Sequence, residues 1–290
     1  MLFSIETLQQ LFPNSIGNQL FTHVTEIVLD SREKSKQSLF VPIVGERFDA
    51  HDFIEQAIEN GAVATLWVTE KPIPTHLKDK CQFFLVEDTL VGLQLLAKYY
   101  RNEINPIVIG ITGSNGKTST KDLVASILKT TYKTHYTKGN FNNHIGLPIT
   151  ILQMSRDTEV LIVEMGMSDF GEIDQLTKIA QPNYAIITNV GESHIEFLGS
   201  REGIAKAKLE IVNGLKRNGT IVVDGDEPLL MNVPKEYNVI RCGFTNNEVN
   251  EYCISDIAID IEKTVFFVQN KSYTIPLLGK HHAKNATYAI

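Results

Sequence analysis

Residues 110–118, with the sequence GITGSNGKT, form a glycine-rich segment between an apolar run and an amphipathic pattern. The apolar run over 107–111 predicts a buried strand, and hydrophobic residues recurring at four-residue spacing from Leu123 predict a helix over 117–131. A loop between such a strand and helix points successive backbone N–H groups, and the positive end of the helix dipole, at one spot. A polyphosphate satisfies both, so the segment predicts a phosphate-binding loop.

The loop also carries the two side chains that a nucleoside triphosphate site needs. Lys117 is placed to reach the terminal phosphates, and the Thr118 hydroxyl is placed to bind Mg²⁺. The strict nucleotide-binding pattern has glycine where this chain has Ile111, so we expect Gly110 and Gly113 to supply the flexibility. The alternative is an ordinary strand–helix turn with an incidental lysine, but the flanking pattern favours ATP with Mg²⁺.

Charge and composition exclude several other classes of protein. The chain has 290 residues, 43% of them hydrophobic, and a formal net charge of -7. A nucleic-acid surface needs a basic field, so we expect no nucleic-acid partner. We also expect no membrane insertion, because there is neither an apolar leader nor an apolar run of the roughly 18 residues that a span needs. The three cysteines do not have the spacing of a metal site, and so few cysteines suit a reducing compartment, so we expect a cytoplasmic protein. We also expect a monomer.

The pattern of elements divides the chain into two α/β parts that meet near 102–106, a polar stretch with a proline. We expect a small α/β domain over 1–103 and a second α/β domain over 104–290. In the first domain the expected strands are 26–30, 39–43, 62–68 and 82–86, and the expected helices are 5–12, 52–60 and 89–101.

In the second domain strands and helices alternate up to residue 224, which predicts a mostly parallel sheet with helices on both faces. The expected strands are 107–111, 159–163, 184–188 and 219–224, and the expected helices are 117–131, 146–154, 171–179 and 200–217. The chain then becomes strand-rich, over 238–241, 252–259, 265–268 and 273–275, before a helix opens near His281. That helix has no stop signal before Ile290, so we expect a fragment whose second domain is incomplete.

Two further buried strands of the second domain end in polar side chains. One ends at Glu164, and the next is followed by Thr188 and Asn189, with His194 in the loop beyond. Functional groups gather at the carboxyl ends of strands in open α/β sheets, and an acid there can hold Mg²⁺ together with phosphate oxygens. Taken alone, Glu164 could equally be a strand-end acid exposed to water, and a lone histidine such as His194 is more often a hydrogen-bonded loop residue than a ligand. Together with the phosphate loop, the three strand ends favour a catalytic site.

The helix over 200–217 contains an unexpected lysine. Ile204 and Ile211 define its apolar stripe, and Lys208 lies inside that stripe, whereas Lys206 lies on the polar face. A lysine on a buried face is costly unless its charge is paired or removed. Lys208 is therefore either a paired or snorkelling lysine, or one whose lowered pKa leaves an amine that reacts with carbon dioxide. The resulting carbamate is a carboxylate able to hold a second metal ion.

Two polar segments are candidates for substrate binding. Asn142 and Asn143 lie in an amide-rich loop that enters a helix, and such a loop can donate neutral hydrogen bonds to a sugar or a pyrophosphate. Earlier in the chain, Ser31-Arg32 and Arg47 follow strands, where the arginines can bind a diphosphate. The alternative for the asparagine loop is an ordinary turn.

With these residues in view, the chain resembles the Mur ligases of peptidoglycan synthesis. The resemblance covers essentially the whole chain and rests on a small set of motifs. They are Asp30-Ser31-Arg32, Leu39-Phe40-Val41-Pro42, the phosphate loop, Asn142-Asn143-His144-Ile145-Gly146-Leu147-Pro148, Glu164-Met165-Gly166, Ile187-Thr188-Asn189 and Gly203-Ile204-Ala205-Lys206-Ala207-Lys208. The asparagine loop and the Glu-Met-Gly stretch point, within the family, to members that add D-alanyl-D-alanine.

The resemblance implies a three-domain enzyme. Residues 1–103 would bind the UDP-sugar, residues 104–290 would form the central ATPase, and a C-terminal domain outside this chain would bring the incoming amine. In the implied reaction, ATP phosphorylates the C-terminal carboxylate of UDP-MurNAc-tripeptide. The amino group of D-alanyl-D-alanine then attacks the acyl phosphate, and phosphate leaves.

By position, the resemblance also implies roles for single residues. The implied catalytic residues are Lys117, Glu164, His194 and Lys208. The implied metal ligands are Thr118, Glu164, His194 and Lys208 as its carbamate. The nucleotide would contact Gly113, Ser114, Asn115, Gly116, Lys117, Thr118 and Ser119, with Asn285 at the adenine. The substrate would contact Ser31, Arg32, Arg47, Asn142, Asn143, Thr188 and Asn189.

Two positions differ from the family's pattern, since His282 stands where Asn is usual and Ala50 stands where Gly is common. Other functions are compatible with the same motifs. One is a related ligase, such as another Mur ligase or a folylpolyglutamate synthetase, and another is a nucleotide-binding module that hydrolyses ATP without making a bond, or a binding module only. The sequence does not determine whether the third peptide residue is lysine or diaminopimelate.

Overall fold

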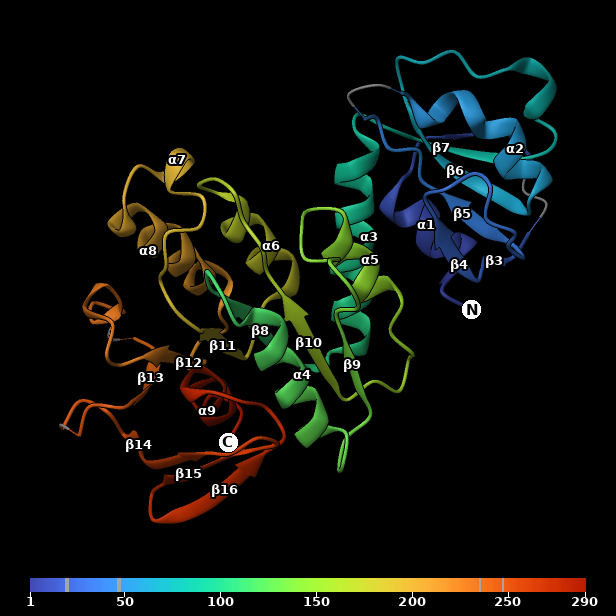
Figure 1. Cartoon of the computed structure of the whole chain (residues 1–290). Coiled ribbons are helices and arrows are strands. Elements are labelled where there is room, and N and C mark those ends of the chain that lie inside the picture. Colours follow the sequence, from blue (N-terminus) through green and yellow to red (C-terminus); the bar gives the residue numbers. More distant parts are fainter. Residues whose placement is uncertain (19–20, 46–47, 235, 247) are drawn as a thin grey trace. The chain divides into compact units, whose positions relative to one another are not determined.

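The computed structural model describes residues 1–18, 21–45, 48–234, 236–246 and 248–290. The chain folds into two compact units, Met1–Tyr100 and Arg101–Ile290, each with its own sheet (Figure 1). The predicted α/β class is therefore confirmed for both. None of the helices in the described ranges has the length and apolarity that crossing a membrane requires.

The first unit is built on a five-stranded sheet in the order β2-β7-β6-β5-β4, which is parallel except at β2. Its strands are β2 (Ser15–Ile16), β4 (Glu26–Val28), β5 (Ser38–Phe40), β6 (Ala62–Val68) and β7 (Gln82–Val86). A small ribbon pairs β1 (Phe3–Ser4) with β3 (His23–Val24). The helical segments are α1 (Ile5–Leu11), η1 (Ala50–Phe53), α2 (Ile54–Glu59), η2 (Thr75–Leu77) and α3 (Thr89–Ile104), whose last four residues belong to the second unit.

The polar stretch 102–106, where we expected the two parts to meet in a linker, is helical in its first half. Helix α3 continues through residues 102–104, and the chain leaves the helical conformation at Asn105, which has a positive φ of 49°. Asparagine tolerates that left-handed conformation better than most residues, and Pro106 cannot continue a helix, so the two residues end α3. The polar composition of 102–104 reflects an exposed last turn of a helix.

The second unit is built on a nine-stranded sheet in the order β16-β15-β14-β13-β12-β11-β8-β10-β9. Its strands are β8 (Ile107–Thr112), β9 (Thr134–Tyr136), β10 (Val160–Glu164), β11 (Tyr184–Ile187), β12 (Thr220–Asp224), β13 (Asn238–Gly243), β14 (Tyr252–Ile259), β15 (Thr264–Val268) and β16 (Lys271–Ile275). The strands from β9 to β14 pair in parallel, and β15 and β16 add antiparallel strands at one edge, so the predicted mostly parallel sheet is confirmed. The helices are α4 (Lys117–Leu128), α5 (Gly146–Leu152), α6 (Glu172–Ala180), α7 (Ile195–Leu198), α8 (Arg201–Leu209), η3 (Glu210–Gly214), η4 (Pro228–Leu230) and α9 (Lys280–Thr287).

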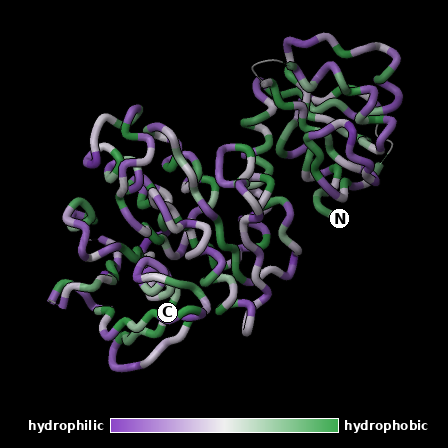
Figure 2. Tube along the Cα trace, in the orientation of Figure 1, coloured by the Kyte–Doolittle hydropathy of each residue, from purple (hydrophilic) through white to green (hydrophobic). Residues whose placement is uncertain are grey.

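Helices cover both faces of this sheet, because its central strands are apolar on both sides. On one face, Ile111, Ile162 and Ile186 pack with Val124 of α4 and with Tyr288 beside α9. On the other face, α6 and η3 pack against each other and lie over β8. Figure 2 shows hydrophobic residues concentrated inside each unit and hydrophilic ones mainly along its periphery.

The order β11-β8-β10 places three parallel strands side by side, next to the edge strand β9 (Figure 1). Glu164 at the end of β10 pairs with Ile111 of β8, and Ile187 at the end of β11 pairs with Thr112. The three carboxyl ends therefore finish at the same level, and the loops that follow them share one edge of the sheet.

We expect Ile162→Ala to lower the free energy of unfolding by about 2–5 kcal/mol, because the side chain is 0% exposed and its loss leaves a cavity. Ile261→Ala removes the same atoms from a side chain that is 89% exposed and should change stability by less than about 0.5 kcal/mol. Urea unfolding of both variants checks this, and equal effects would contradict the assigned core.

Candidate active site

The loop between β8 and α4 has the backbone of a phosphate cradle. Gly116 caps α4 in the left-handed conformation at φ 79°, and Lys117 is the first residue of the helix. Gly113 has φ 151°, and a Cβ atom there would lie 1.9 Å from Oγ1 of Thr188. Only glycine fits at position 113, because the loop passes so close to the end of β11.

Gly110 does not supply the loop's flexibility, and that expectation was wrong. Gly110 lies inside β8 and has no positive φ. A Cβ atom there would lie 3.0 Å from Cε of Met165 and 3.5 Å from Cδ1 of Ile211. A small residue is needed at this position because η3 and the segment after β10 pack against the strand. The loop conformation instead depends on Gly113 and Gly116.

The loop after β11 holds the phosphate loop in place through Ser114 and Asn115. The backbone N–H of Asn115 donates to Oδ1 of Asn189 at 3.0 Å, and Oγ1 of Thr188 donates to the carbonyl of Asn115 at 2.6 Å. The backbone N–H of Gly191 donates to Oγ of Ser114 at 2.8 Å. Thr188 and Asn189 were predicted to contact substrate, but the polar contacts of their side chains are with the phosphate loop.

Lys117 folds back over the loop that precedes it. Its Nζ donates to the carbonyl of Gly113 at 2.8 Å. Burial lowers the pKa of Lys117, and the negative charge of Glu164 acts in the opposite direction. A second, longer contact joins Nζ to the carbonyl of Ser114 at 3.5 Å. An ammonium held only by backbone carbonyls can exchange these contacts for a phosphate oxygen.

Glu164 lies at the end of β10 and is only 3% exposed. Oγ1 of Thr118 donates to its Oε2 at 2.9 Å, and Nδ2 of Asn142 donates to its Oε1 at 3.0 Å. Thr118 and Glu164 therefore place two oxygen atoms close enough to share one Mg²⁺. No three His, Cys, Asp or Glu side chains of the described ranges converge on one metal position. Mg²⁺ usually takes one or two protein ligands and completes its shell with water and phosphate.

Lys208 of α8 is buried, as the stripe of hydrophobic residues predicts, with 2% of its surface exposed, whereas Lys206 is exposed. Within the described residues the Lys208 ammonium forms no ion pair. Burial, and to a smaller extent the positive charge of Lys117, lower its pKa from the ordinary value of 10.5 to about 7. A large fraction of Lys208 is thus a neutral amine near neutral pH, which is the form that reacts with carbon dioxide.

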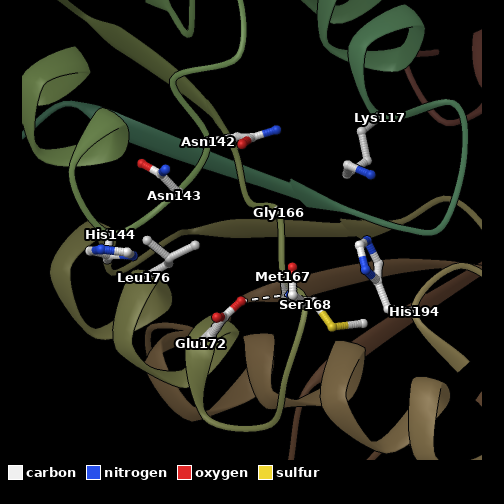
Figure 3. Close-up of a pocket in the computed structure, with 10 residues that line it drawn as sticks. All are labelled: Lys117, Asn142, Asn143, His144, Gly166, Met167, Ser168, Glu172, Leu176 and His194. Carbon is white, nitrogen blue, oxygen red and sulfur yellow. Dashed lines mark hydrogen bonds between the residues drawn. The ribbon is translucent and has the colours of Figure 1, made fainter. Parts of the chain in front are cut away.

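An open cavity of about 390 Å³ adjoins Lys117 (Figure 3). His194, at the start of α7, lines the same cavity, so the structure brings these two predicted residues together. Asn142 and Asn143 line it as well, and the Asn143 side chain also caps α5 by accepting from the backbone N–H of Gly146 at 2.8 Å. Sequence reasoning missed the remaining wall, which is Gly166, Met167, Ser168, Glu172, Leu176 and His144.

Asn285 of α9 lies against the phosphate loop, since a Cβ atom on Gly116 would be 2.9 Å from its Oδ1. The neighbouring Lys284 forms a buried ion pair that sequence reasoning missed. Its Nζ donates to both oxygens of Asp224 at 2.8 and 2.9 Å and to Asp226 at 3.3 Å. Burial raises the pKa of Asp224 despite the Lys284 contact. The pair ties α9, and with it Asn285, to the end of β12.

In the first unit, Ser31 and Arg32 follow β4. Oγ of Ser31 donates to Oε1 of Gln56 at 2.7 Å. The Arg32 side chain is 78% exposed and pairs with Asp30 through two nitrogen atoms, and this contact lowers the pKa of Asp30 to about 2. Arg47 lies outside the described residues. Ala50, one of the two departures from the family pattern, begins η1 and is buried.

A parallel α/β sheet with a phosphate loop, a strand-end acid and a buried amine at one edge is typical of ATP-binding domains that use a divalent cation. Residues 111–290 match the family described as Mur ligase middle domain, and residues 23–100 match the Mur ligase family catalytic domain. The chain belongs to the Mur ligase family.

Individual relatives are similar over nearly the whole chain. The UDP-N-acetylmuramoyl-tripeptide–D-alanyl-D-alanine ligase of Bacillus subtilis is 45% identical over 99% of this chain and 62% of the relative. A structure of UDP-N-acetylmuramoylalanyl-D-glutamyl-2,6-diaminopimelate–D-alanyl-D-alanyl ligase from Acinetobacter baumannii has a TM-score of 0.87 and 30% identity, covering 99% of this chain and 64% of that chain. The MurF ligase of Thermotoga maritima in complex with ADP has a TM-score of 0.81 and 34% identity, and the match covers 92% of this chain and 62% of that chain. The chain thus spans less than two thirds of the length of these relatives.

We expect Lys208→Met to stabilise the protein most below pH 7. There the folded wild type carries a buried ammonium whose penalty, at about 1.36 kcal/mol per pKa unit, is at most about 5 kcal/mol. Between about 7 and 10.5 the folded protein binds fewer protons than the unfolded chain, so wild-type stability rises with pH and the advantage of the variant falls. Urea unfolding across that pH range, in buffer free of carbon dioxide, measures the difference. A difference independent of pH would contradict the buried, uncompensated amine.

We expect Lys284→Met to destabilise the protein by about 1–3 kcal/mol, because Asp224 loses its buried partner. Adding Asp224→Asn should restore part of that loss, since it removes the unpaired charge. Chemical denaturation of the two single variants and the double variant tests the coupling, and strictly additive effects would show that the pair does not act as a unit.

Proposed function

We propose that this chain is the UDP-sugar-binding and ATP-binding part of a ligase that adds D-alanyl-D-alanine to UDP-MurNAc-tripeptide. The observation that carries the proposal is the meeting of Lys117, Thr118 and Glu164 at one sheet edge beside the buried amine of Lys208. It occurs in a chain that is 45% identical to a Bacillus subtilis enzyme of that name.

In this proposal the phosphate loop binds ATP. The loop residues Gly113, Ser114, Asn115, Gly116 and Ser119 surround the phosphates with backbone and side-chain donors. Lys117 exchanges its contact with the Gly113 carbonyl for the terminal phosphate, and Asn285 contacts the adenine. The ADP complex of the Thermotoga maritima relative supports a nucleotide as ligand. Thr188 and Asn189 act as positioning residues, because their side chains hold Asn115.

Thr118 and Glu164 would hold one Mg²⁺, and His194 with the carbamate of Lys208 would serve a second. Bound Mg²⁺ neutralises charge as the phosphoryl group moves between two anions. Glu164 is already oriented for this by hydrogen bonds from Thr118 and Asn142. Lys208 supplies the amine, and burial keeps much of it neutral near pH 7.

The substrate's terminal carboxylate would lie at the Lys117 and His194 end of the cavity. There one carboxylate oxygen attacks the terminal phosphorus of ATP, ADP leaves, and an acyl phosphate forms. The amino group of D-alanyl-D-alanine then attacks the acyl carbon, the carbon–oxygen bond to phosphate breaks, and the amine loses a proton. The third residue of the peptide would be lysine or diaminopimelate, the latter as in the name of the Acinetobacter baumannii relative.

The first unit would bind the UDP portion through Ser31, Arg32 and Arg47. Arg32 is exposed and its guanidinium is already oriented by Asp30, which suits a phosphate contact. We further propose a cytoplasmic monomer with no nucleic-acid partner and no membrane insertion. The net charge of -7 supports the exclusion of nucleic acid.

The test is ADP release by the protein expressed to the stop codon of its gene. We expect release only when UDP-MurNAc-tripeptide and D-alanyl-D-alanine are both present, with a product heavier by the dipeptide in mass spectrometry. Lys117→Met should abolish it by removing the phosphate contact. Release that ignores both substrates would favour a simple nucleotide-hydrolysing module, and release that depends on a folate substrate would favour a folylpolyglutamate synthetase.

A further inference from the structure

We propose that Glu172 binds the side-chain ammonium of the substrate's third residue, whose carboxyl group is activated. This inference rests on the proposed function and deepens it. It assigns the far part of the cavity beside Lys117, which the phosphate chemistry leaves unused, to recognition of an amine.

The cavity has two chemically different ends (Figure 3). Lys117 and His194 line one end and face the phosphate loop, while Glu172 and Leu176 of α6 line the other. Its volume of about 390 Å³ lies within the range of small-molecule sites. A residue whose carboxylate lies at the first end can therefore extend its side chain into the second.

Glu172 is held in a fixed position with one oxygen available. Its Oε2 accepts the backbone N–H of Ser168 at 2.6 Å, and this contact fixes the carboxylate at the cavity wall. In the described part of the chain, neither an ion pair nor another hydrogen bond engages Oε1 of Glu172. A carboxylate at a cavity wall that pairs with no protein cation among the described residues is complementary to a cationic ligand group.

The remaining wall suits an aliphatic side chain that ends in an amine. Met167 and Leu176 provide apolar surface along the cavity wall. Lysine and diaminopimelate both carry methylene groups followed by an amine, so Met167 and Leu176 would contact the methylenes and Glu172 the ammonium. On this basis Glu172 binds the side-chain amine that lysine and diaminopimelate share, and it does not distinguish between these two residues.

A purely structural role for Glu172 is the competing explanation. An acid in the first turn of a helix stabilises the helix dipole, and the bond to Ser168 shapes the preceding turn. A structural role predicts that loss of the carboxylate affects all substrates equally. Amine recognition predicts an effect only on substrates that carry the amine.

The experiment compares two acceptor substrates of the full-length protein. One is UDP-MurNAc-tripeptide with lysine in third place, and the other carries norleucine, which has the same chain length without the amine. For the wild type we expect a KM at least about tenfold higher for the norleucine substrate, with kcat within about twofold. Glu172→Gln should raise KM about tenfold for the lysine substrate and leave KM for the norleucine substrate unchanged.

Asp174→Asn is the matched control, because it removes a carboxylate from the same helical turn that does not line the cavity. It should preserve the wild-type preference. Equal KM values for the two substrates in the wild type would overturn the inference, and so would a Glu172→Gln effect that is the same for both. The wild-type comparison stands even if the variant does not fold. Ligation of neither substrate would instead contradict the proposed function.

Discussion

The site depends on the parallel pairing of three adjacent strands of the second unit's sheet, β11, β8 and β10. Their carboxyl ends finish at one level because Glu164 pairs with Ile111 and Ile187 with Thr112. The phosphate loop, Glu164 and the loop that leads to His194 therefore lie together at one edge of the sheet. A one-residue slip in either pairing would turn Glu164 or the loop after β11 away from the phosphate loop.

Lys208 adds a different constraint to this edge. The protein places an ammonium in an apolar helix face near Lys117, where neither burial nor charge favours it. Stability alone does not explain such a residue, because a hydrophobic side chain would pack there at lower cost. The cost is understandable if the amine is converted to a carbamate, which would reverse its charge and place an anion near the metal ligands.

Much of this was predictable from local sequence patterns. Apolar runs predicted the central strands, and the four-residue spacing around Lys208 predicted its burial, because both signals are encoded by neighbouring residues. Contacts between distant residues were not predictable. Lys284 and Asp224 are 60 positions apart, and nothing near either residue signals the pair. The loop-holding role of Thr188 also required the structure, since its contact with Asn115 spans 73 positions.

The most direct test of the account is the position of the metal in crystals grown with Mn²⁺ and a non-hydrolysable ATP analogue. Mn²⁺ replaces Mg²⁺ at oxygen ligands and is located by its anomalous scattering. The account predicts a peak within bonding distance of Oγ1 of Thr118 and the Glu164 carboxylate, with the analogue's phosphates on the loop before α4. Nucleotide bound away from that loop, or a metal that contacts neither residue, would contradict it.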